Sequence, residues 1–459
     1  MASRSADTPQ GKGRKEPLPA RSAKHKPLPL LLRAYRLATT LLAPVASLLL
    51  AIRGLRGKEV RGRRGERYGV ATIPRPEGPL VWFHAASVGE TSAVMPIIHK
   101  LAGDRPDITL LLTTGTRTSA RVAEERLPAS ALHQFVPLDV AAFVRRFLDH
   151  WRPDAGVFAE SEIWPNLLVE ASARDVHLVL VNGRLSVRSF ARWRKRPATS
   201  LALFGRLGQV LAQSDRHAAR FRELGAPAVV TTGNLKIDAP LLPVDAKAHS
   251  ELEPALRGRP VFVAASTHDG EEDMVAEAHE AAREKLTRLL TIVAPRHPER
   301  GGRIASRLRA RGIEVAQRSR GEKITPSTGI YLADTIGELG LFYALSPLAF
   351  IGGSLVPHGG QNPVEAMRHD CVVMTGPYVQ NFEDTYEALY DGDACVEVGS
   401  ASELAAEAVR LLSDKDRASA MLRAGKTALQ RMEGALERSI RALMPALPAA
   451  AAKVPERAK

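Results

Sequence analysis

Short apolar segments alternate with helical stretches between residues 80 and 376, and this alternation restricts the folds open to the chain. Ten segments of strand length end in polar or glycine-rich residues: 80–85, 108–115, 155–160, 177–183, 209–214, 261–266, 289–295, 330–334, 348–353 and 371–376. Strands separated by helices pair in parallel through βαβ units. The sequence therefore predicts an α/β protein with doubly wound parallel sheets.

The strand pattern pauses at residues 239–260, which are rich in Ala, Pro and charge, and then restarts. A chain of 459 residues, 45% of them hydrophobic, can form two sizeable cores. We therefore expect a domain over 57–240 and another over 241–440, with an Ala/Pro-rich tail at 441–459. Since ligands bind at the carboxyl ends of such strands, the expected site is a cleft between the domains.

Residues 348–366 combine an apolar strand, two pairs of glycines and a polar turn that opens a helix. Gly352 and Gly353 would let the backbone approach a phosphate, and the next pair, Gly359 and Gly360, would permit a positive φ. Asn362 and Glu365 would then lie in the first helical turn, where Asn362 can cap the helix or Glu365 can accept hydrogen bonds from ribose hydroxyls. This pattern is typical of a nucleotide-binding loop. A glycine-rich connection with an ordinary helix cap is the alternative.

Glu90 follows the first apolar strand and lies at the start of a predicted helix. The helix dipole favours its ionised form whereas partial burial raises the pKa of a carboxylate, so Glu90 is a candidate general base. A glutamate that merely complements the helix dipole is the alternative.

Glu160 and Glu162 stand two residues apart where another strand ends. In an extended segment this spacing puts both carboxylates on one side, which favours a functional acidic pair. Capping of the helix that follows Pro165 by one of them is the other interpretation.

Three polar segments supply possible partners for a leaving phosphate: 233–236, 295–300 and 334–339. Lys236 or Arg296 could neutralise charge that develops on departure. We expect Arg300 to be a surface charge.

The histidines His84, His268, His297 and His358 show no metal-ligand spacing, so neither a bound metal nor a cofactor is expected. The absence of Walker A and G-x-G-x-x-G sequences weighs against an ATPase and a dinucleotide dehydrogenase.

The net charge of +14 is concentrated at the N-terminal end, since residues 1–70 carry 16 Lys or Arg and 4 acids. A basic end of this kind indicates an arm or a membrane contact, and the nearly neutral remainder lacks the motifs of nucleic-acid-binding proteins. We expect a disordered basic tail over 1–30. Cys371 and Cys395 are too few for a disulfide framework, which favours a reducing cytoplasm.

Residues 37–52 form an uncharged apolar run between arginines, within a predicted membrane-anchor helix over 31–56. At about 1.5 Å per residue the run spans roughly 24 Å, less than the hydrocarbon core of a bilayer. Positive charge on both sides favours a helix that lies in or dips into the cytoplasmic leaflet. A buried core helix is the alternative, and a cleaved signal peptide is less consistent with the flanking residues.

Ten motifs occur in an order that resembles the 3-deoxy-D-manno-octulosonic acid (Kdo) transferases of lipid A biosynthesis. They are HAASVGE, AESEIWPN, VNGRLSVRS, AQSDRHAARFRELGA, GNLK, ASTHDGEE, APRHPER, DTIGELG, GGSLVPHGGQNPVEA and GPYVQNF, and the similarity covers about residues 30–435. The resemblance implies the GT-B glycosyltransferase fold, with two Rossmann-like domains facing a cleft. It also implies inverting transfer of Kdo from CMP-Kdo to lipid IVA, at the cytoplasmic face of the inner membrane.

Carried over position by position, the resemblance makes Glu90 the catalytic base and lets Glu160 and Lys236 stabilise the transition state. It places the CMP contacts on Pro295, Arg296, Gly337, Glu338, Leu339, Asn362, Pro363, Val364 and Glu365. The chain departs from the family pattern at Gln361 and Ala366, where His and Pro are expected. Details of the ribose or phosphate contact depend on these two positions.

A membrane-surface enzyme with a doubly phosphorylated acceptor needs cationic residues near its site. Six candidates cluster in one segment: Arg184, Arg188, Arg192, Arg194, Lys195 and Arg196. A solvated charged loop is the alternative for this cluster. For the whole chain, the alternatives are a GT-B transferase that uses a UDP-sugar and another membrane lipid, and an inactive membrane-bound scaffold.

Overall fold

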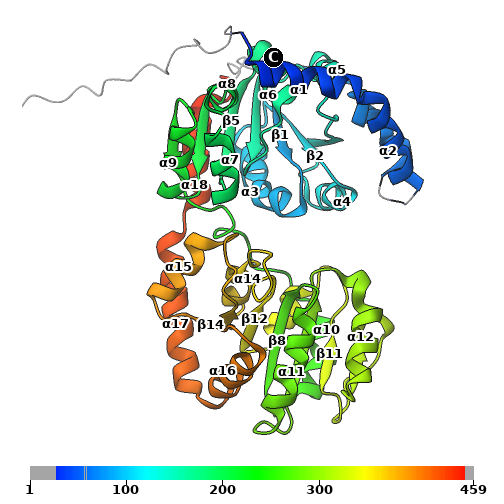
Figure 1. Cartoon of the computed structure of the whole chain (residues 1–459), viewed down its shortest axis with the longest axis vertical. Coiled ribbons are helices and arrows are strands. Elements are labelled where there is room, and N and C mark those ends of the chain that lie inside the picture. Colours follow the sequence, from blue (N-terminus) through cyan, green and yellow to red (C-terminus); the bar gives the residue numbers. More distant parts are fainter. Residues whose placement is uncertain (1–26, 56, 58, 450–459) are drawn as a thin grey trace, which may run out of the picture. The chain divides into compact units, whose positions relative to one another are not determined.

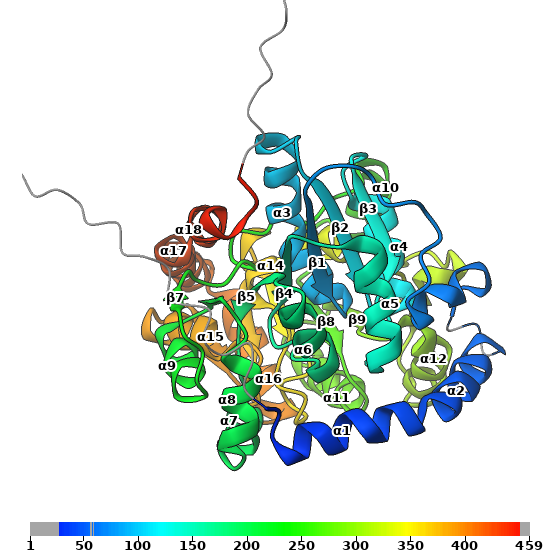
Figure 2. The ribbon, with the colours of Figure 1, turned by 90° about the horizontal axis from the view of Figure 1, so that it is seen from above.

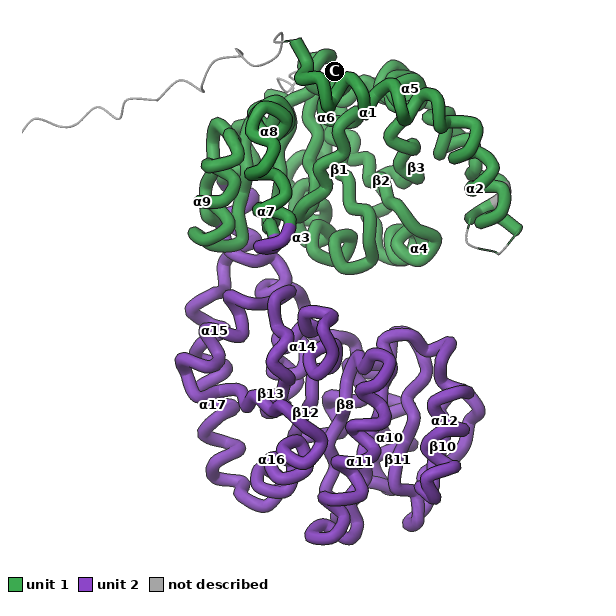
Figure 3. Tube along the Cα trace, viewed as in Figure 1, with its two compact units in different colours: residues 1–185, 189–231, 442–459 green, residues 186–188, 232–441 purple. Residues whose placement is uncertain are grey.

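A computed structural model describes residues 27–55, 57 and 59–449, which divide into two compact units (Figure 3). The first unit takes the described residues within 1–185, 189–231 and 442–459, and the second takes 186–188 and 232–441. The main division falls between Thr231 and Thr232, whereas the sequence pattern put it at residue 240. The expected basic tail up to residue 26, and the C-terminal tail from residue 450, lie outside the described residues.

The first unit is built on a seven-stranded parallel sheet in the order β3-β2-β1-β4-β5-β6-β7 (Figure 1). Its strands are β1 (Leu80–Ala85), β2 (Thr109–Thr114), β3 (Ala131–Phe135), β4 (Ala155–Ala159), β5 (His177–Gly183), β6 (Gln209–Ala212) and β7 (Val229–Thr231). The helices between and after them are α3 (Val88–Asp104), α4 (Arg117–Arg126), α5 (Ala141–Trp151), α6 (Pro165–Ala173), α7 (Val187–Arg194), α8 (Pro197–Phe204) and α9 (Asp215–Glu223). A 3-10 helix, η1 (Arg61–Tyr68), precedes the first strand.

The second unit has its own seven-stranded parallel sheet, in the order β10-β11-β9-β8-β12-β13-β14. Its strands are β8 (Val261–Thr267), β9 (Leu290–Pro295), β10 (Val315–Gln317), β11 (Ile330–Leu332), β12 (Leu348–Ile351), β13 (Val372–Thr375) and β14 (Cys395–Glu397). Its helices are α10 (Ala246–Leu256), α11 (Glu271–Arg283), α12 (Gly301–Ala310), α13 (Leu339–Ala344), α14 (Pro363–Arg368), α15 (Glu383–Asp391), α16 (Ala401–Ser413) and α17 (Lys415–Met432). The 3-10 helices η2 (Pro298–Arg300) and η3 (Arg318–Arg320) lie in its loops.

Both faces of the second sheet are covered, as a doubly wound fold requires. Val261 and Val263 of β8 belong to one buried cluster, and Phe262 and Ala264 belong to another. Successive side chains of a strand point to opposite faces, so strand β8 contributes to a core layer on each side. In the first unit, Trp82 packs against Phe147 and Phe158 with ring centroids 5.0 Å apart in each pair.

All ten strands expected from the sequence are present, which confirms the doubly wound α/β class. Four further strands were not expected: β3, β7, β10 and β14. Each of these four lies at an edge of its sheet.

The expected single helix over 31–56 is wrong, because the structure has two helices there, α1 (Leu30–Leu41) and α2 (Ala43–Leu55). They are bent by 55° at Leu42. Pro44 accounts for the break, since proline has no N–H to donate and its ring clashes with the carbonyl four residues earlier. Among the described residues, no single helix has the length and apolar character to cross a membrane, although the bent pair together reaches that length and composition.

The described part of the C-terminal tail is folded rather than extended. Helix α18 (Ala435–Leu443) and the 3-10 helix η4 (Met444–Ala446) form most of it, and the described chain ends at residue 449. Leu443 and Leu447 are buried, and Arg105 donates a 2.9 Å hydrogen bond to the carbonyl of Pro448. Apolar side chains near the start of the tail therefore attach it to the first unit.

Candidate active site

Glu90 lies in the first turn of α3, directly after β1. Ser87 caps this helix, and the Glu90 carboxylate accepts hydrogen bonds from the Ala86 N–H at 2.8 Å and the Ser87 hydroxyl at 2.9 Å. Burial raises the pKa of Glu90, and the nearby carboxylates of Glu162 and Glu160 raise it further. A carboxylate whose pKa is raised toward neutrality is suited to accept a proton.

Glu162 is held as an anion between two aromatic partners. Its Oε2 lies 3.3 Å from Nε2 of the fully buried His84, and it accepts a 2.5 Å hydrogen bond from the Trp164 indole N–H. Burial alone would raise the pKa of Glu162, but the contact with His84 and the hydrogen bond from Trp164 outweigh it and lower the pKa. A fixed negative charge therefore stands close to Glu90. In the sequence, His84 stands out only as a histidine without metal-ligand spacing.

Glu160 adopts a left-handed backbone conformation, with φ of 48°. Strand β4 ends at Ala159, so Glu160 lies in a turn and the expectation of an extended segment through Glu162 is wrong. Both carboxylates still act on Glu90. The Glu160 carboxylate lies 3.9 Å from the Arg184 guanidinium, and the main chain of Glu160 bonds to Val181 and Arg184 of the β5 segment. Strained backbone of this kind is characteristic of functional sites.

In the second unit, the glycine-rich loop after β12 is organised by a carboxylate of the protein itself. The fully buried Glu271 accepts hydrogen bonds from the backbone N–H groups of Gly353, Ser354 and Leu355 at 2.7 to 2.9 Å. It also accepts one from the His268 N–H at 2.8 Å. The expectation that the Gly353 backbone receives a phosphate is therefore wrong for this N–H group, because Glu271 already occupies it.

Glycine is required at these positions of the loop for different structural reasons. A Cβ on Gly352 would come within 2.7 Å of the Ser266 carbonyl oxygen. Gly352 therefore allows two backbone segments of the protein to lie close together, and the space beside it is not open to a ligand. Gly359 and Gly360 have φ of 91° and 74°, which confirms the positive φ expected for that pair. Gly360 N–H donates to the carbonyl of Gly353, closing the loop.

The polar turn that follows has the expected helix cap. Asn362 caps α14 by accepting from the Val364 N–H, and Pro363 occupies the first helical position. The Asn362 amide also donates to the Glu365 carboxylate at 3.0 Å. Asn362 therefore fixes both the start of the helix and the orientation of Glu365.

Two of the expected site residues of this unit, Lys236 and Arg296, act electrostatically on a third, Glu365. Burial raises the pKa of Glu365, while the hydrogen bond from Asn362 and the charges of Lys236 and Arg296 partly lower it. The Lys236 ammonium lies 5.4 Å from the centre of the Phe382 ring. Arg296 is exposed at the end of β9, directly after the buried Pro295. The structure thus brings two cations close enough to one carboxylate to lower its pKa.

Gly337, Glu338 and Leu339 form the turn that begins α13. Gly337 has φ of 89°, and Leu339 is the first residue of the helix. Glu338 is tied to Arg318 by hydrogen bonds of 2.5 and 3.1 Å, and this pairing lowers the pKa of Glu338. Arg318 was missed in the sequence because it lies twenty residues earlier, outside any quoted motif.

Arg300 is buried, so the expectation of a surface charge is wrong. Its guanidinium donates to both carboxylate oxygens of Glu272 at 2.9 Å and also bonds to Asp269. Glu272 is itself almost fully buried, which explains why it needs a cation beside it. Arg300 therefore joins the loop after β9 to the start of α11.

Three histidines gather beside Gln361, a position where the chain departs from its family pattern. The His268 ring is stacked on His358 with centroids 4.2 Å apart, and His297 approaches its edge at 5.9 Å. Burial, followed by the charges of His358 and His297, lowers the pKa of His268 to about 4. The Gln361 amide nitrogen lies 3.1 Å from His268 Nε2, which can accept its hydrogen because the ring is neutral.

The described residues contain no group of three or more His, Cys, Asp or Glu side chains arranged to hold a metal ion. The candidate residues therefore form two sets. The first unit holds the carboxylates Glu90, Glu160 and Glu162, and the second holds Lys236, Arg296, Glu365 and the turns around them.

Known proteins resemble this chain over most of its length. Residues 62–239 match the family model of 3-deoxy-D-manno-octulosonic-acid transferase (kdotransferase). The probable mitochondrial 3-deoxy-D-manno-octulosonic acid transferase of Arabidopsis thaliana is 38% identical over 392 residues, covering 83% of this chain and 87% of that protein. The Haemophilus influenzae 3-deoxy-D-manno-octulosonic acid transferase is 34% identical over 419 residues, covering 89% and 98%.

Solved structures agree with the fold. HepE of Anabaena, in complex with UDP and glucose, superposes with a TM-score of 0.56 at 15% identity, covering 80% of this chain and all of that one. A glycosyltransferase from Rickettsia africae superposes with a TM-score of 0.55 at 11% identity, covering 81% and 98%. Likeness at this identity concerns the fold alone, and it confirms the expected GT-B architecture of two Rossmann-like domains. The motifs, the fold and the relatives together place the chain in the family of 3-deoxy-D-manno-octulosonic acid transferases.

Proposed function

We propose that this protein transfers Kdo from CMP-Kdo to lipid IVA, with inversion at the anomeric carbon, in lipopolysaccharide biosynthesis. The observation that carries the proposal is the environment of Glu90. Its pKa is raised by burial and by Glu162 and Glu160, while Glu162 is itself kept ionised by His84 and Trp164. This is the arrangement that a general base needs if it is to work close to neutral pH.

In the proposed reaction Glu90 removes the proton from the acceptor hydroxyl as its oxygen attacks the anomeric carbon of Kdo. The bond from that carbon to the cytidylate oxygen breaks, and its electron pair leaves with CMP. Glu160 is assigned a stabilising role in the same step, as the family resemblance implies.

The leaving cytidylate carries negative charge that fixed cations can stabilise. Lys236 and Arg296 are suited to this task, because both already act electrostatically on Glu365 in the same unit. We assign CMP binding to Pro295, Arg296, the turn 337–339 and the segment 362–365. Glu365, oriented by Asn362, is the candidate acceptor for ribose hydroxyls.

A lipid acceptor is supported by the apolar surface of α1 and α2. Ten large hydrophobic side chains of this pair are exposed: Leu30, Leu31, Leu37, Leu41, Leu42, Val45, Leu48, Leu49, Ile52 and Leu55. A patch of this extent on a water-soluble surface is unusual and indicates contact with a membrane or partner.

The attachment of α1 to the first unit favours a helix that lies in the plane of the membrane. Its Tyr35 donates a 2.9 Å hydrogen bond to Asp139, and its Arg36 pairs with Glu170 of α6 at 2.5 Å. Figure 2 shows α1 beside α6, with α2 continuing beyond it. Since the polar face of α1 is bound to protein, its apolar face can enter one leaflet without the helix crossing the bilayer. We propose attachment to the cytoplasmic leaflet of the inner membrane.

Basic residues beside the acidic loop suit the phosphates of such an acceptor. Arg192 and Arg196 line a cavity of about 300 Å³ together with Ser161, which neighbours Glu160. Arg194, Lys195 and Arg196 are exposed. We therefore propose that the basic segment 184–196 binds the phosphates of the acceptor.

The proposal is tested by incubating purified protein with lipid IVA and CMP-Kdo and weighing the products. We expect one or more mass increments of Kdo, inhibition by CMP, and little inhibition by UDP at the same concentration. No Kdo product, or preferential inhibition by UDP, would replace this proposal with a UDP-sugar transferase.

A further inference from the structure

A cavity of about 400 Å³ lies under α2 in the first unit, at the carboxyl ends of β1, β2 and β3. Apolar side chains form much of its wall, among them Ala46, Leu49, Leu50, Val136 and Leu138. Small-molecule sites commonly have volumes of about 300–1,000 Å³ and mostly apolar linings, so this cavity falls within their range.

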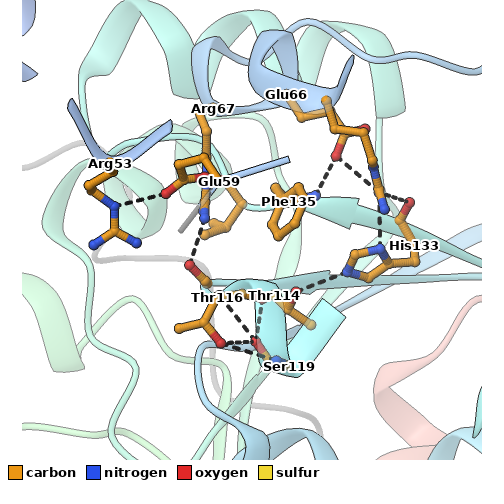
Figure 4. A network of polar contacts seen from close by, with 12 residues as sticks. Arg53, Glu59, Glu66, Arg67, Thr114, Thr116, Ser119, His133 and Phe135 are labelled. Carbon is orange, nitrogen blue, oxygen red and sulfur yellow. Dashed lines mark hydrogen bonds and ion pairs between the residues drawn. The ribbon is translucent and has the colours of Figure 1, made fainter. Parts of the chain in front are cut away.

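Four charged groups line this cavity, and one of them, Asp139, accepts hydrogen bonds from the Tyr35 hydroxyl and the N–H groups of Asn166 and Leu167. The other three are paired with one another and with backbone carbonyls. Glu59 accepts from Arg53 at 2.9 Å and lies 3.3 Å from the Arg67 guanidinium (Figure 4). Arg67 also donates to the carbonyls of Gly115 at 2.6 Å and Val136 at 3.3 Å. Because these polar groups already have partners, they do not need water in the cavity, and an apolar guest can occupy it.

The cavity adjoins the acidic site through the immediate partners of two carboxylates. Ala86, which lines the cavity, donates its N–H to Glu90. Trp164, which also lines it, donates its indole N–H to Glu162. A chain held in the cavity would therefore end beside the proposed base.

The opposite wall of the cavity belongs to the helix that we expect to touch the membrane. Ala46 and Leu50 of α2 line the cavity, while Val45, Leu48 and Ile52 of the same helix are exposed on its other side. A hydrocarbon chain can thus pass from a leaflet to the cavity around a single apolar helix.

We propose that this cavity binds one fatty acyl chain of the acceptor lipid and so positions its sugar hydroxyl at Glu90. The inference rests on the proposed transfer to a lipid and adds the site of chain recognition. It explains why an α/β unit places an apolar cavity next to the partners of Glu90 and Glu162.

The first test fills the cavity with an aromatic ring. The variant is Ala46→Phe, and the matched control is Ala51→Phe, which adds the same ring to α2 at a residue outside the cavity wall. We expect Ala46→Phe to raise the KM for tetraacylated acceptor about tenfold, the factor for roughly two methylene groups that lose their burial. The KM for CMP-Kdo and for a fully deacylated acceptor should match the control. An unchanged KM for the tetraacylated lipid, or an equal rise for both acceptors, would overturn the proposal.

The second test needs no variant and no activity. Wild-type protein is irradiated with a long-chain fatty acid that carries a diazirine, and the labelled residues are identified by mass spectrometry. We expect labels on Leu50, Val136 or Leu138. Labels confined to the exposed face of α2 would contradict the cavity as a chain site, even if Ala46→Phe failed to fold. If wild-type protein transferred no Kdo but the cavity were labelled, the proposed function would fail and the chain site would stand.

Discussion

The Glu162 carboxylate lies 3.3 Å from Nε2 of His84, a fully buried histidine on the neighbouring strand β1. This contact keeps a negative charge beside Glu90 in a region that would otherwise favour a neutral acid. The pKa of Glu162 is lowered while the pKa of Glu90 is raised, although the two side chains are close together. Two carboxylates with pKa values moved in opposite directions can take different roles in one reaction.

The first prediction concerns pH. Glu90 must be ionised to accept a proton, so activity should fall as the pH drops through its raised pKa. Replacing Glu162 by Gln removes a charge that raises the pKa of Glu90. The acidic limb of the kcat/KM profile should therefore move to lower pH in Glu162→Gln. Exposed Glu125→Gln serves as the control and should keep the wild-type profile. A shift to higher pH would contradict the electrostatic coupling.

At Glu90, a rise in pH changes the stability of the fold in the opposite direction to the activity. A folded-state pKa above the unfolded value means that folding favours protonated Glu90, so this contribution to stability is present in acid and is lost as the pH rises through the raised pKa. The cost of an ionised Glu90 at neutral pH is consistent with a site kept for function rather than for stability.

The second prediction concerns the cation at the leaving group. Lys236→Ala should lower kcat by about 10²–10³, the usual effect of removing one fixed group that stabilises developing charge. Lys236→Arg should restore part of the loss, because it keeps the charge. Exposed Lys247 provides the control, and Lys247→Ala should leave kcat unchanged. Equal kcat in wild type and Lys236→Ala would remove Lys236 from the mechanism.

The third prediction concerns the loop after β12. In Glu271→Gln one carboxylate oxygen becomes an amide NH₂, which would face two of the four backbone N–H groups that now donate to the carboxylate. We expect a loss of about 3 kcal/mol in the free energy of unfolding, measured in urea, and weaker CMP binding. Glu277→Gln, at an exposed position on the same helix α11, should change neither quantity. Unaltered stability in Glu271→Gln would show that the carboxylate does not organise this loop.

The fourth prediction concerns membrane attachment. Leu41 and Leu48 are 69% and 62% exposed on α1 and α2, so a double change to Asp leaves the protein core intact. Each leucine inserted in a leaflet contributes about 1.5–3 kcal/mol, and the double variant should move mostly to the soluble fraction in flotation with anionic vesicles. Leu201→Asp changes a comparably exposed leucine on α8 and should still float. Flotation of the double variant would exclude this surface as the membrane contact.

The central strands could be predicted from the sequence, whereas the edge strands could not. Strands such as β1, β4 and β12 are buried along their whole length and appear as continuous apolar runs. Strands β7 and β14 are only three residues long and partly exposed. An edge strand is paired on one side only, so its sequence carries a weaker apolar signal.

The candidate site was predictable where one short motif holds all its parts. The Asn362 cap and the positive φ of Gly359 and Gly360 are of this kind. Partners that come from distant segments were missed. Glu271 lies 82 residues before Gly353, and no local pattern reveals that they meet. The turn at Glu160 was also missed, since a left-handed residue other than glycine has no reliable sequence signal.

Whether Glu90 is the base for Kdo transfer can be measured as the kcat of Glu90→Gln with CMP-Kdo and lipid IVA. Gln keeps the size of the side chain and can accept from the Ala86 N–H, but it cannot take a proton. We expect a loss of about 10²–10⁴ in kcat with CMP binding unchanged. A Glu90→Gln protein that transfers Kdo at the wild-type rate would contradict this expectation.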